Sequence, residues 1–234
     1  MTTRRHYRAP SVLTIAVQGV GFEPRNLGSA GSLRLKYLSY LIRQRMLEYL
    51  VLVAAFASLL GAFAYIHSMF KGQTKPNRVT WLMWTIAPFI ATAAALSNGV
   101  GWAVIPVFMS GFSPFLVFTA SFFNKKAYWK PASFDYCCGM LSGLAIVLWY
   151  LTNVPNLAII FAIISDALAA VPTLTKAWRN PETESSWPFI VGIFTPLTSF
   201  LVATAWAFSE LAFPIYLIVI NILLVFSVSK RKMR

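Results

Sequence analysis

Charged residues are scarce in this chain of 234 residues. Asp, Glu, Lys and Arg make up 12% of it, whereas hydrophobic residues make up 58%. An average soluble domain contains about 25% charged residues. A chain with so few of them cannot cover its surface with polar groups in water. The composition therefore excludes an ordinary soluble domain and indicates an integral membrane protein with the lipid bilayer as its surroundings.

Residues that bind metals or form disulfides are almost absent. The two cysteines, Cys137 and Cys138, are adjacent, which is poor geometry for a disulfide, and the only histidines are His6 and His67. We expect no metal site and no cofactor. The apolar runs contain neither a Ser/His/Asp set nor a nucleotide-binding loop, so we also expect no enzymatic activity. The last run has no lysine that could hold retinal.

Basic residues outnumber acidic ones and give a formal net charge of +13. Their placement argues against a nucleic-acid partner, because they form short clusters between long uncharged runs, as in the loops of membrane proteins. Between Val79 and Asn124, for example, there is no Asp, Glu, Lys or Arg. The sequence also lacks an Asn-X-Ser/Thr sequon, which favours a bacterial inner membrane as its location.

A transmembrane helix needs about 20 apolar residues. Seven runs meet or approach this length, and turn residues such as Ser97-Asn98-Gly99 separate them. We therefore predict an all-α fold of seven transmembrane helices, with Glu210 in the turn before the last one. The predicted ranges are Tyr49–Phe70, Val79–Ser97, Trp102–Phe123, Tyr136–Thr152, Asn156–Thr175, Trp187–Ser209 and Leu211–Ser229.

The basic residues fix the predicted orientation. From position 46 onward they occupy every second connection and the segment after the last helix, whereas the other connections contain none. Because basic loops stay in the cytoplasm, we predict an N-terminus outside the cell membrane and a C-terminus in the cytoplasm. The residues are Lys71, Lys75, Arg78, Lys125, Lys126, Lys130, Lys176, Arg179, Lys230, Arg231, Lys232 and Arg234.

Residues 1–45 depart from this pattern, because they carry eight Lys and Arg on the predicted outer side. They show neither a sustained helical or strand period nor the apolar region of a signal peptide. We interpret them as a disordered basic extension. We favour the hypothesis that translation starts at Met46 over a genuine basic tail.

Predicted helices one to three resemble predicted helices five to seven. Since a fourth helix lies between them, the two copies have the same orientation in the membrane. The predicted units are 46–124 and 156–230, joined by a linker helix within 125–155 and followed by a basic tail, 231–234. The matched pairs are Pro88 and Pro196, Pro106 and Pro214, both 108 residues apart, and Trp81 and Trp187, 106 apart across a gap of two residues.

Two local patterns accompany this three-plus-one-plus-three arrangement: Lys75-Pro76-Asn77-Arg78-Val79-Thr80-Trp81, and Val171-Pro172-Thr173 through Trp178, Pro181 and Glu182. Over about residues 46–230, the chain resembles the SWEET/PQ-loop transporter superfamily, and most closely its uncharacterised bacterial members. The resemblance implies alternating access about prolines in the first two helices of each unit. Pro88, Pro172 and Pro196 fit this pattern as hinges.

The chain departs from the family in two respects. Ile66 stands where the fourth hinge proline is expected, and the Pro-Gln pair is replaced by Ile66-His67 in the first unit and by Pro172-Thr173 in the second. An asymmetric hinge, or the loss of transport, is compatible with these differences.

Asp166 is the one carboxylate inside a predicted span, about 15 Å deep by helix rise. A charge there costs about 2.5–3.5 kcal/mol and must be paired, hydrated or protonated. Some PQ-loop proteins, such as lysosomal cystine exporters, couple substrate to protons through helix carboxylates, and Asp166 resembles these. The alternative is a structural Asp hydrogen-bonded to a neighbouring Ser or Thr. We favour the proton-coupling role.

Three further residues are candidates for substrate binding. Ser113 and Asn221 lie at similar depth in equivalent helices, where SWEET-like proteins place pocket asparagines, and Trp84 offers a ring for stacking. The simpler interpretation of both polar residues is contact between helices. Near the predicted cytoplasmic ends we interpret Trp81 and Trp187 as an aromatic belt and His67 as interfacial, with a proton relay as the alternative for His67. We interpret the segment 181–184 as a solvated loop whose acids could pair with basic loops across the repeat.

These features predict a transporter for a small neutral polar solute, a sugar or an amino-acid-like molecule, because no Lys or Arg lies inside a span to bind an anion. The alternative is a receptor or scaffold that has the same fold and does not transport. The sequence leaves open whether the protein forms an oligomer.

Overall fold

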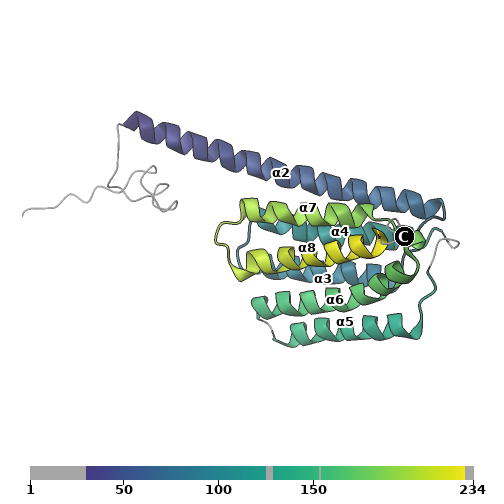
Figure 1. Ribbon diagram of the computed structural model, residues 1–234. Helices are drawn as coiled ribbons and strands as arrows, with labels where there is room; N and C mark the ends of the chain where they lie inside the picture. Colours follow the sequence, from purple (N-terminus) through teal and green to yellow (C-terminus); the bar gives the residue numbers. More distant parts are fainter. Residues whose placement is uncertain (1–29, 125–128, 153, 230–234) are drawn as a thin grey trace, which may run out of the picture. The chain divides into compact units, whose positions relative to one another are not determined.

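The computed structural model describes residues 30–124, 129–152 and 154–229, and this part of the chain is all-helical (Figure 1). The chain divides into two units, Met1–Gln44 and Arg45–Arg234, and the site described below lies within the second. The helices are α2 (Ala30–Phe70), α3 (Arg78–Ser97), η2 (Trp102–Val104), α4 (Ile105–Ala120), α5 (Ser133–Thr152), α6 (Pro155–Arg179), η3 (Pro181–Thr183), α7 (Trp187–Val202) and α8 (Phe208–Ser229).

Several of these helices are able to cross a membrane. Within the described residues, five are long and apolar enough: Leu41–Phe70, Arg78–Ser97, Trp102–Ala120, Pro155–Arg179 and Phe208–Ser229. Two shorter apolar helices, Ser133–Leu148 and Trp187–Val202, accompany them. The prediction of an all-helical fold is thereby confirmed for the described residues, and five helices have the length and composition that a membrane protein requires. The count of seven spans remains a prediction.

The expected lack of regular structure in residues 1–45 is wrong for residues 30–45, which form the first turns of α2. The segment from Leu33 to Arg45 contains no Gly or Pro and is rich in Leu, Arg, Lys and Gln, which favour helix. It therefore continues the apolar helix that follows without a break. Residues 1–29 lie outside the described residues.

The boundary between the last two helices also differs from the prediction. Helix α7 ends at Val202, and α8 begins at Phe208, so Glu210 lies in the first turn of α8 rather than in a turn between helices. Its carboxylate accepts hydrogen bonds from the backbone N–H groups of Thr204, Ala205 and Trp206 at 2.8–3.1 Å. Glu210 thus holds the connection between α7 and α8, in which Trp206 adopts a φ of 51°.

Other helix ends follow from familiar local chemistry. The side chain of Asn77 accepts a hydrogen bond from the N–H of Val79 and so caps α3, which ends before Gly99 with a φ of 78°. Pro155 stands at the start of α6, where its missing N–H costs nothing.

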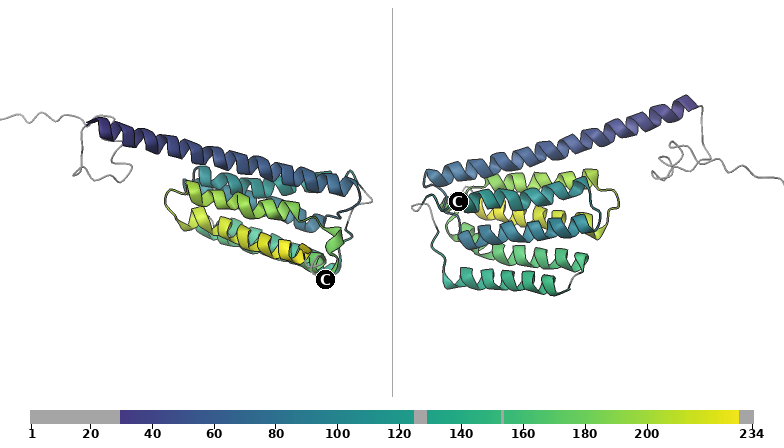
Figure 2. Two further views of the ribbon diagram at one scale, coloured as in Figure 1. Left: turned by 45° about the horizontal axis from the view of Figure 1, so that its top comes forward. Right: turned by 180° about the vertical axis from the view of Figure 1, so that it is seen from behind.

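Contacts join six helices of the second unit into a closed ring in the order α2, α4, α3, α6, α8 and α7. Helix α4 contacts α2 through the hydrogen bond from the Ser113 hydroxyl to the Ser58 carbonyl, and α5 lies outside the ring, next to α6 (Figures 1 and 2). The ring closes where α7 meets α2: the Thr195 hydroxyl donates to the Ala54 carbonyl at 3.3 Å, and a Cβ on Gly61 would meet Val191 at 3.4 Å. Helix α5 packs chiefly on α6 and also contacts α3.

The connections that carry the basic residues meet at one end of this ring of helices, which we call the basic end. The N–H of Lys75, between α2 and α3, donates to the Thr183 carbonyl between α6 and α7 at 3.0 Å. The N–H of Trp129, before α5, donates to the Pro76 carbonyl at 3.3 Å. The described end of α8, Ser229, lies at the same end as these connections in Figure 1.

Candidate functional site

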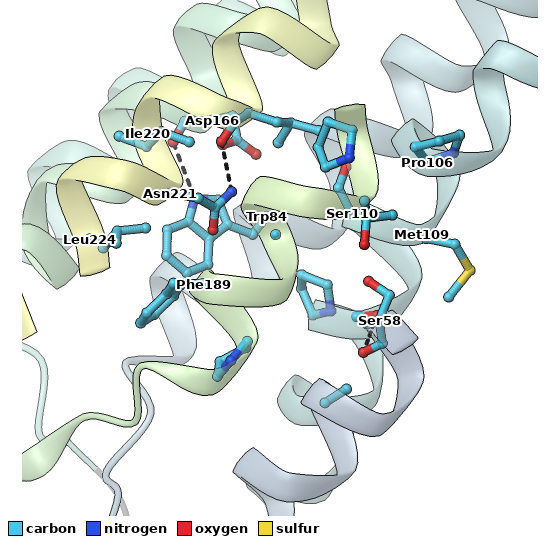
Figure 3. Close-up of a pocket in the computed structure, with 18 of the residues that line it drawn as sticks. Ser58, Trp84, Pro106, Met109, Ser110, Asp166, Phe189, Ile220, Asn221 and Leu224 are labelled. Atoms are coloured by element: carbon cyan, nitrogen blue, oxygen red, sulfur yellow. Dashed lines mark hydrogen bonds between the residues drawn. The ribbon is translucent and has the colours of Figure 1, made fainter. Parts of the chain in front are cut away.

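A cavity of about 80 Å³ lies inside the ring, which is room for several water molecules (Figure 3). All six ring helices contribute to its wall, and α5 does not. Most of the lining is apolar, with a small number of polar side chains from different helices. These polar residues are Ser58, Ser110, Ser113, Asp166, Thr195 and Asn221. An apolar concave site with a few convergent polar groups is the usual form of a small-molecule site.

The cavity wall includes Asp166, which is only 3% exposed. One of its carboxylate oxygens, Oδ2, accepts a hydrogen bond from the Tyr216 hydroxyl on α8 at 2.7 Å. Among the described residues, no Lys, Arg or His lines the cavity. The hydrogen bond to Tyr216 joins α6 to α8, so the predicted structural role of this Asp is present in part, although its partner is a Tyr rather than a Ser or Thr.

Trp84 brings an aromatic wall next to this carboxylate. Its indole N–H donates to the Asp166 backbone carbonyl at 3.3 Å, which fixes the ring beside α6 (Figure 3). The ring meets Phe189 edge-on at 6.1 Å between centroids and Trp81 at 5.5 Å. The three aromatic side chains belong to the largest cluster of buried apolar residues among the described helices, and all three line the cavity.

Asn221 and Ser113 both line the cavity as well. The Asn221 amide donates to the Leu217 carbonyl one turn earlier in α8 at 2.8 Å, and Ser113 donates to the Ser58 carbonyl on α2 at 3.4 Å. Gly192 on α7 faces Asn221 so closely that a Cβ there would lie 2.5 Å from the amide oxygen. The structure therefore places these two predicted residues in one site together with Asp166 and Trp84.

The three predicted hinge prolines are buried inside helices: Pro88 in α3, Pro172 in α6 and Pro196 in α7. Only Pro196 of these three lines the cavity. Pro114, which was not among the predicted hinges, lies inside α4 and also lines the cavity. Each such proline removes a backbone hydrogen bond from its helix and so makes bending easier.

A buried ion pair near the basic end was also missed. The Lys176 ammonium lies 2.5 Å from the Glu184 carboxylate, and the two side chains are 2% and 0% exposed. Lys176 also donates to the Lys75 backbone carbonyl, and the Tyr65 hydroxyl donates to the other oxygen of Glu184 at 2.9 Å. The prediction that 181–184 is a solvated loop is therefore wrong for Glu184, because its charge is compensated inside the protein.

The sequence does contain a signal for this pair. Asp166, Ala169, Thr173 and Lys176 follow the spacing i, i+3, i+7 and i+10 of one helix face, and all four are buried. The position of Asp166 inside an apolar run thus predicts that Lys176 points into the protein. Counting Lys176 among the loop residues concealed this relation.

Two predictions for the basic end have different outcomes. Trp81 is 3% exposed and packs on Tyr65 at 4.8 Å between centroids, so its assignment to an aromatic belt is wrong. Trp187 is 63% exposed and remains available for such a belt. His67 is exposed near the end of α2, away from the cavity lining.

Comparison with family models, curated proteins and solved structures finds no match for this chain.

Proposed function

We propose that the chain is a multi-pass membrane transporter that moves a small neutral polar solute, a sugar or an amino-acid-like molecule, by alternating access. The observation that carries this proposal is the cavity. Its wall combines polar side chains from several helices with apolar and aromatic ones, and it lies within a bundle of helices apolar enough for a bilayer. Polar groups inside a membrane cost free energy unless they bind a solute or pair with one another.

The cavity also supports two three-helix units with α5 as a linker, in a seven-helix arrangement. Within each set of three, the third helix contacts both the first and the second. Five pairs of lining residues are separated by the same 108 residues of sequence, one from each set. They are Ser58 and Asp166, Trp81 and Phe189, Trp84 and Gly192, Met109 and Leu217, and Ser113 and Asn221.

This constant spacing gives the repeat a single register. Trp81 corresponds to Phe189, which is buried beside the cavity, rather than to the exposed Trp187, and no gap of two residues is needed. Pro88 and Pro196 keep the same spacing and are candidates for paired hinges, with Pro172 in α6. The resemblance to the SWEET/PQ-loop superfamily stands on this arrangement.

The buried cluster at the basic end is a natural barrier for such a transporter. Tyr65 packs on Trp81, which lines the cavity, and donates to Glu184, which pairs with Lys176. A solute leaving at this end has to pass these contacts, so alternating access requires them to separate. The loops here are basic, and we place this end in the cytoplasm of a bacterial cell, with the N-terminus outside.

The test is uptake by purified protein in proteoliposomes. We expect saturable flux for at least one member of a panel of sugars and amino acids. Replacing Asp166 by Asn should remove the dependence of this flux on a proton gradient. Glu182→Gln, which changes an exposed acid outside the cavity lining, should leave this dependence unchanged. Absence of flux for the whole panel would contradict the proposal and favour the receptor or scaffold, which the missing Pro-Gln pair permits.

A further inference from the structure

The cavity has one carboxyl group and, within the part of the chain that the structure describes, no cation to compensate it when it is ionised. Among the described residues that line the cavity, Asp166 has the only ionisable side chain. The carboxylate accepts one hydrogen bond from Tyr216 at Oδ2, and its other oxygen accepts none within the described part of the chain. The buried ammonium of Lys176, ten residues later in the same helix, pairs with Glu184 instead. An ionised Asp166 therefore needs its counter-charge from outside the protein.

The neighbouring wall is of the kind that binds cations. Trp81, Trp84 and Phe189 all line the cavity, and Trp84 is held beside Asp166 by its hydrogen bond to the Asp166 carbonyl. The negative faces of aromatic rings attract ammonium groups, most strongly where water is excluded. A carboxylate next to aromatic rings therefore offers both contacts that an organic ammonium group uses.

A sugar satisfies this site less well. Its hydroxyl groups can donate to the carboxylate of Asp166, but they leave a net negative charge within apolar surroundings, at a cost that an ammonium group removes. Asn221, Ser110 and Ser113 remain available on the wall for hydroxyl or carbonyl groups of the same molecule.

We propose that the solute carries a protonated amine, which pairs with the Asp166 carboxylate and lies against the rings of Trp84 and Phe189. This inference rests on the proposed function and narrows its substrate class from sugars and amino-acid-like molecules to amine-bearing ones. The amine replaces the proton as counter-charge on Asp166, so the loaded cavity is neutral at this position.

The test compares two probes of the same shape with the full chain in lipid nanodiscs at neutral pH. Serinol differs from glycerol only by an ammonium group in place of the central hydroxyl. We expect serinol to bind at least about tenfold more tightly, as measured by microscale thermophoresis or thermal stabilisation. Equal affinities, or no binding of either probe, would overturn the inference.

Variants identify the group responsible. Asp166→Asn should abolish the preference for serinol, Asp166→Glu should keep part of it, and Glu182→Gln, which is exposed, should keep all of it. If Asp166→Asn does not fold, Trp84→Leu supplies an independent test, because it removes a ring face and should reduce serinol binding more than glycerol binding. A preference that survives in Asp166→Asn would contradict the inference.

The same probes separate this inference from the transport proposal. Selective serinol binding without uptake into proteoliposomes would leave the amine site standing and refute transport. Saturable uptake of sugars without any preference for serinol would leave transport standing and refute the amine site.

Discussion

Gly192 provides the sharpest test of the cavity geometry. It lies on α7 opposite Asn221 of α8, and a Cβ at this position would lie 2.5 Å from the amide oxygen, 2.7 Å from its carbon and 2.9 Å from its nitrogen. All three distances are far below ordinary contact. We predict that Gly192→Ala displaces the Asn221 side chain, since both residues sit on helices packed together in the ring.

The size of the effect follows from three contributions. Adding a methyl group between two packed helices costs about 1–3 kcal/mol. Losing the hydrogen bond from Asn221 to the Leu217 carbonyl adds about 1 kcal/mol. Replacing glycine by alanine inside a helix returns about 0.5–1 kcal/mol. The net expectation is a loss of roughly 1–3 kcal/mol in the free energy of unfolding.

The assay is thermal unfolding of purified protein in detergent, with Gly143→Ala as the matched control. Gly143 lies inside α5, and a Cβ there would meet no atom within 4 Å, so this change should be neutral or slightly stabilising. Asn221→Ala should suppress the defect of Gly192→Ala, because it removes the atoms that clash. An unchanged stability of Gly192→Ala, or an equal loss in the Asn221→Ala background, would refute this geometry.

Two further predictions concern the basic end. Lys176→Met should lower the free energy of unfolding by about 3–5 kcal/mol, because it leaves the buried Glu184 carboxylate without its cation. The double variant Lys176→Met/Glu184→Gln should recover most of this loss in thermal unfolding. A double variant as unstable as the single one would contradict the ion pair. In a cysteine-free background, a membrane-impermeant maleimide should label Gln73→Cys only from the cytoplasmic side and Ser97→Cys only from outside. Labelling of both from one side would disprove the proposed topology.

The sequence predicts most helix boundaries between Arg45 and Arg234 well, because the length of the apolar runs and the turn residues between them both mark the helix ends. The predicted start at Val79 is one residue from the observed start of α3, and the predicted start at Asn156 is one residue from that of α6. Apolar length does not predict the end of α7, which lies at Val202 rather than at Ser209. The segment 203–207 is almost as apolar as the helix before it, and what turns the backbone there is the Glu210 carboxylate, a contact that hydropathy does not record.

The candidate site is predictable to a similar extent. Asp166, Asn221, Ser113 and Trp84 stand out because polar or amphipathic side chains are rare in long apolar runs, and all four line one cavity. The neighbours that shape their chemistry are less visible. Tyr216 looks like one more apolar-run aromatic in the sequence, and its hydroxyl becomes informative only when α6 and α8 are seen in contact.

In the proposed repeat, matching the two halves of the sequence by a rare residue type gives the wrong register. Because tryptophan is rare, Trp81 and Trp187 are easily taken as equivalent positions, although Trp81 is buried and Trp187 is exposed. Burial is what a repeat preserves, because each unit has to present the same face to the cavity. In the proposed register, in which Phe189 takes the place of Trp187, Ser58 corresponds in sequence to Asp166. Among the five pairs of lining residues, this one differs in charge, and the difference makes Asp166 the position at which a transporter of the proposed design would distinguish its solutes.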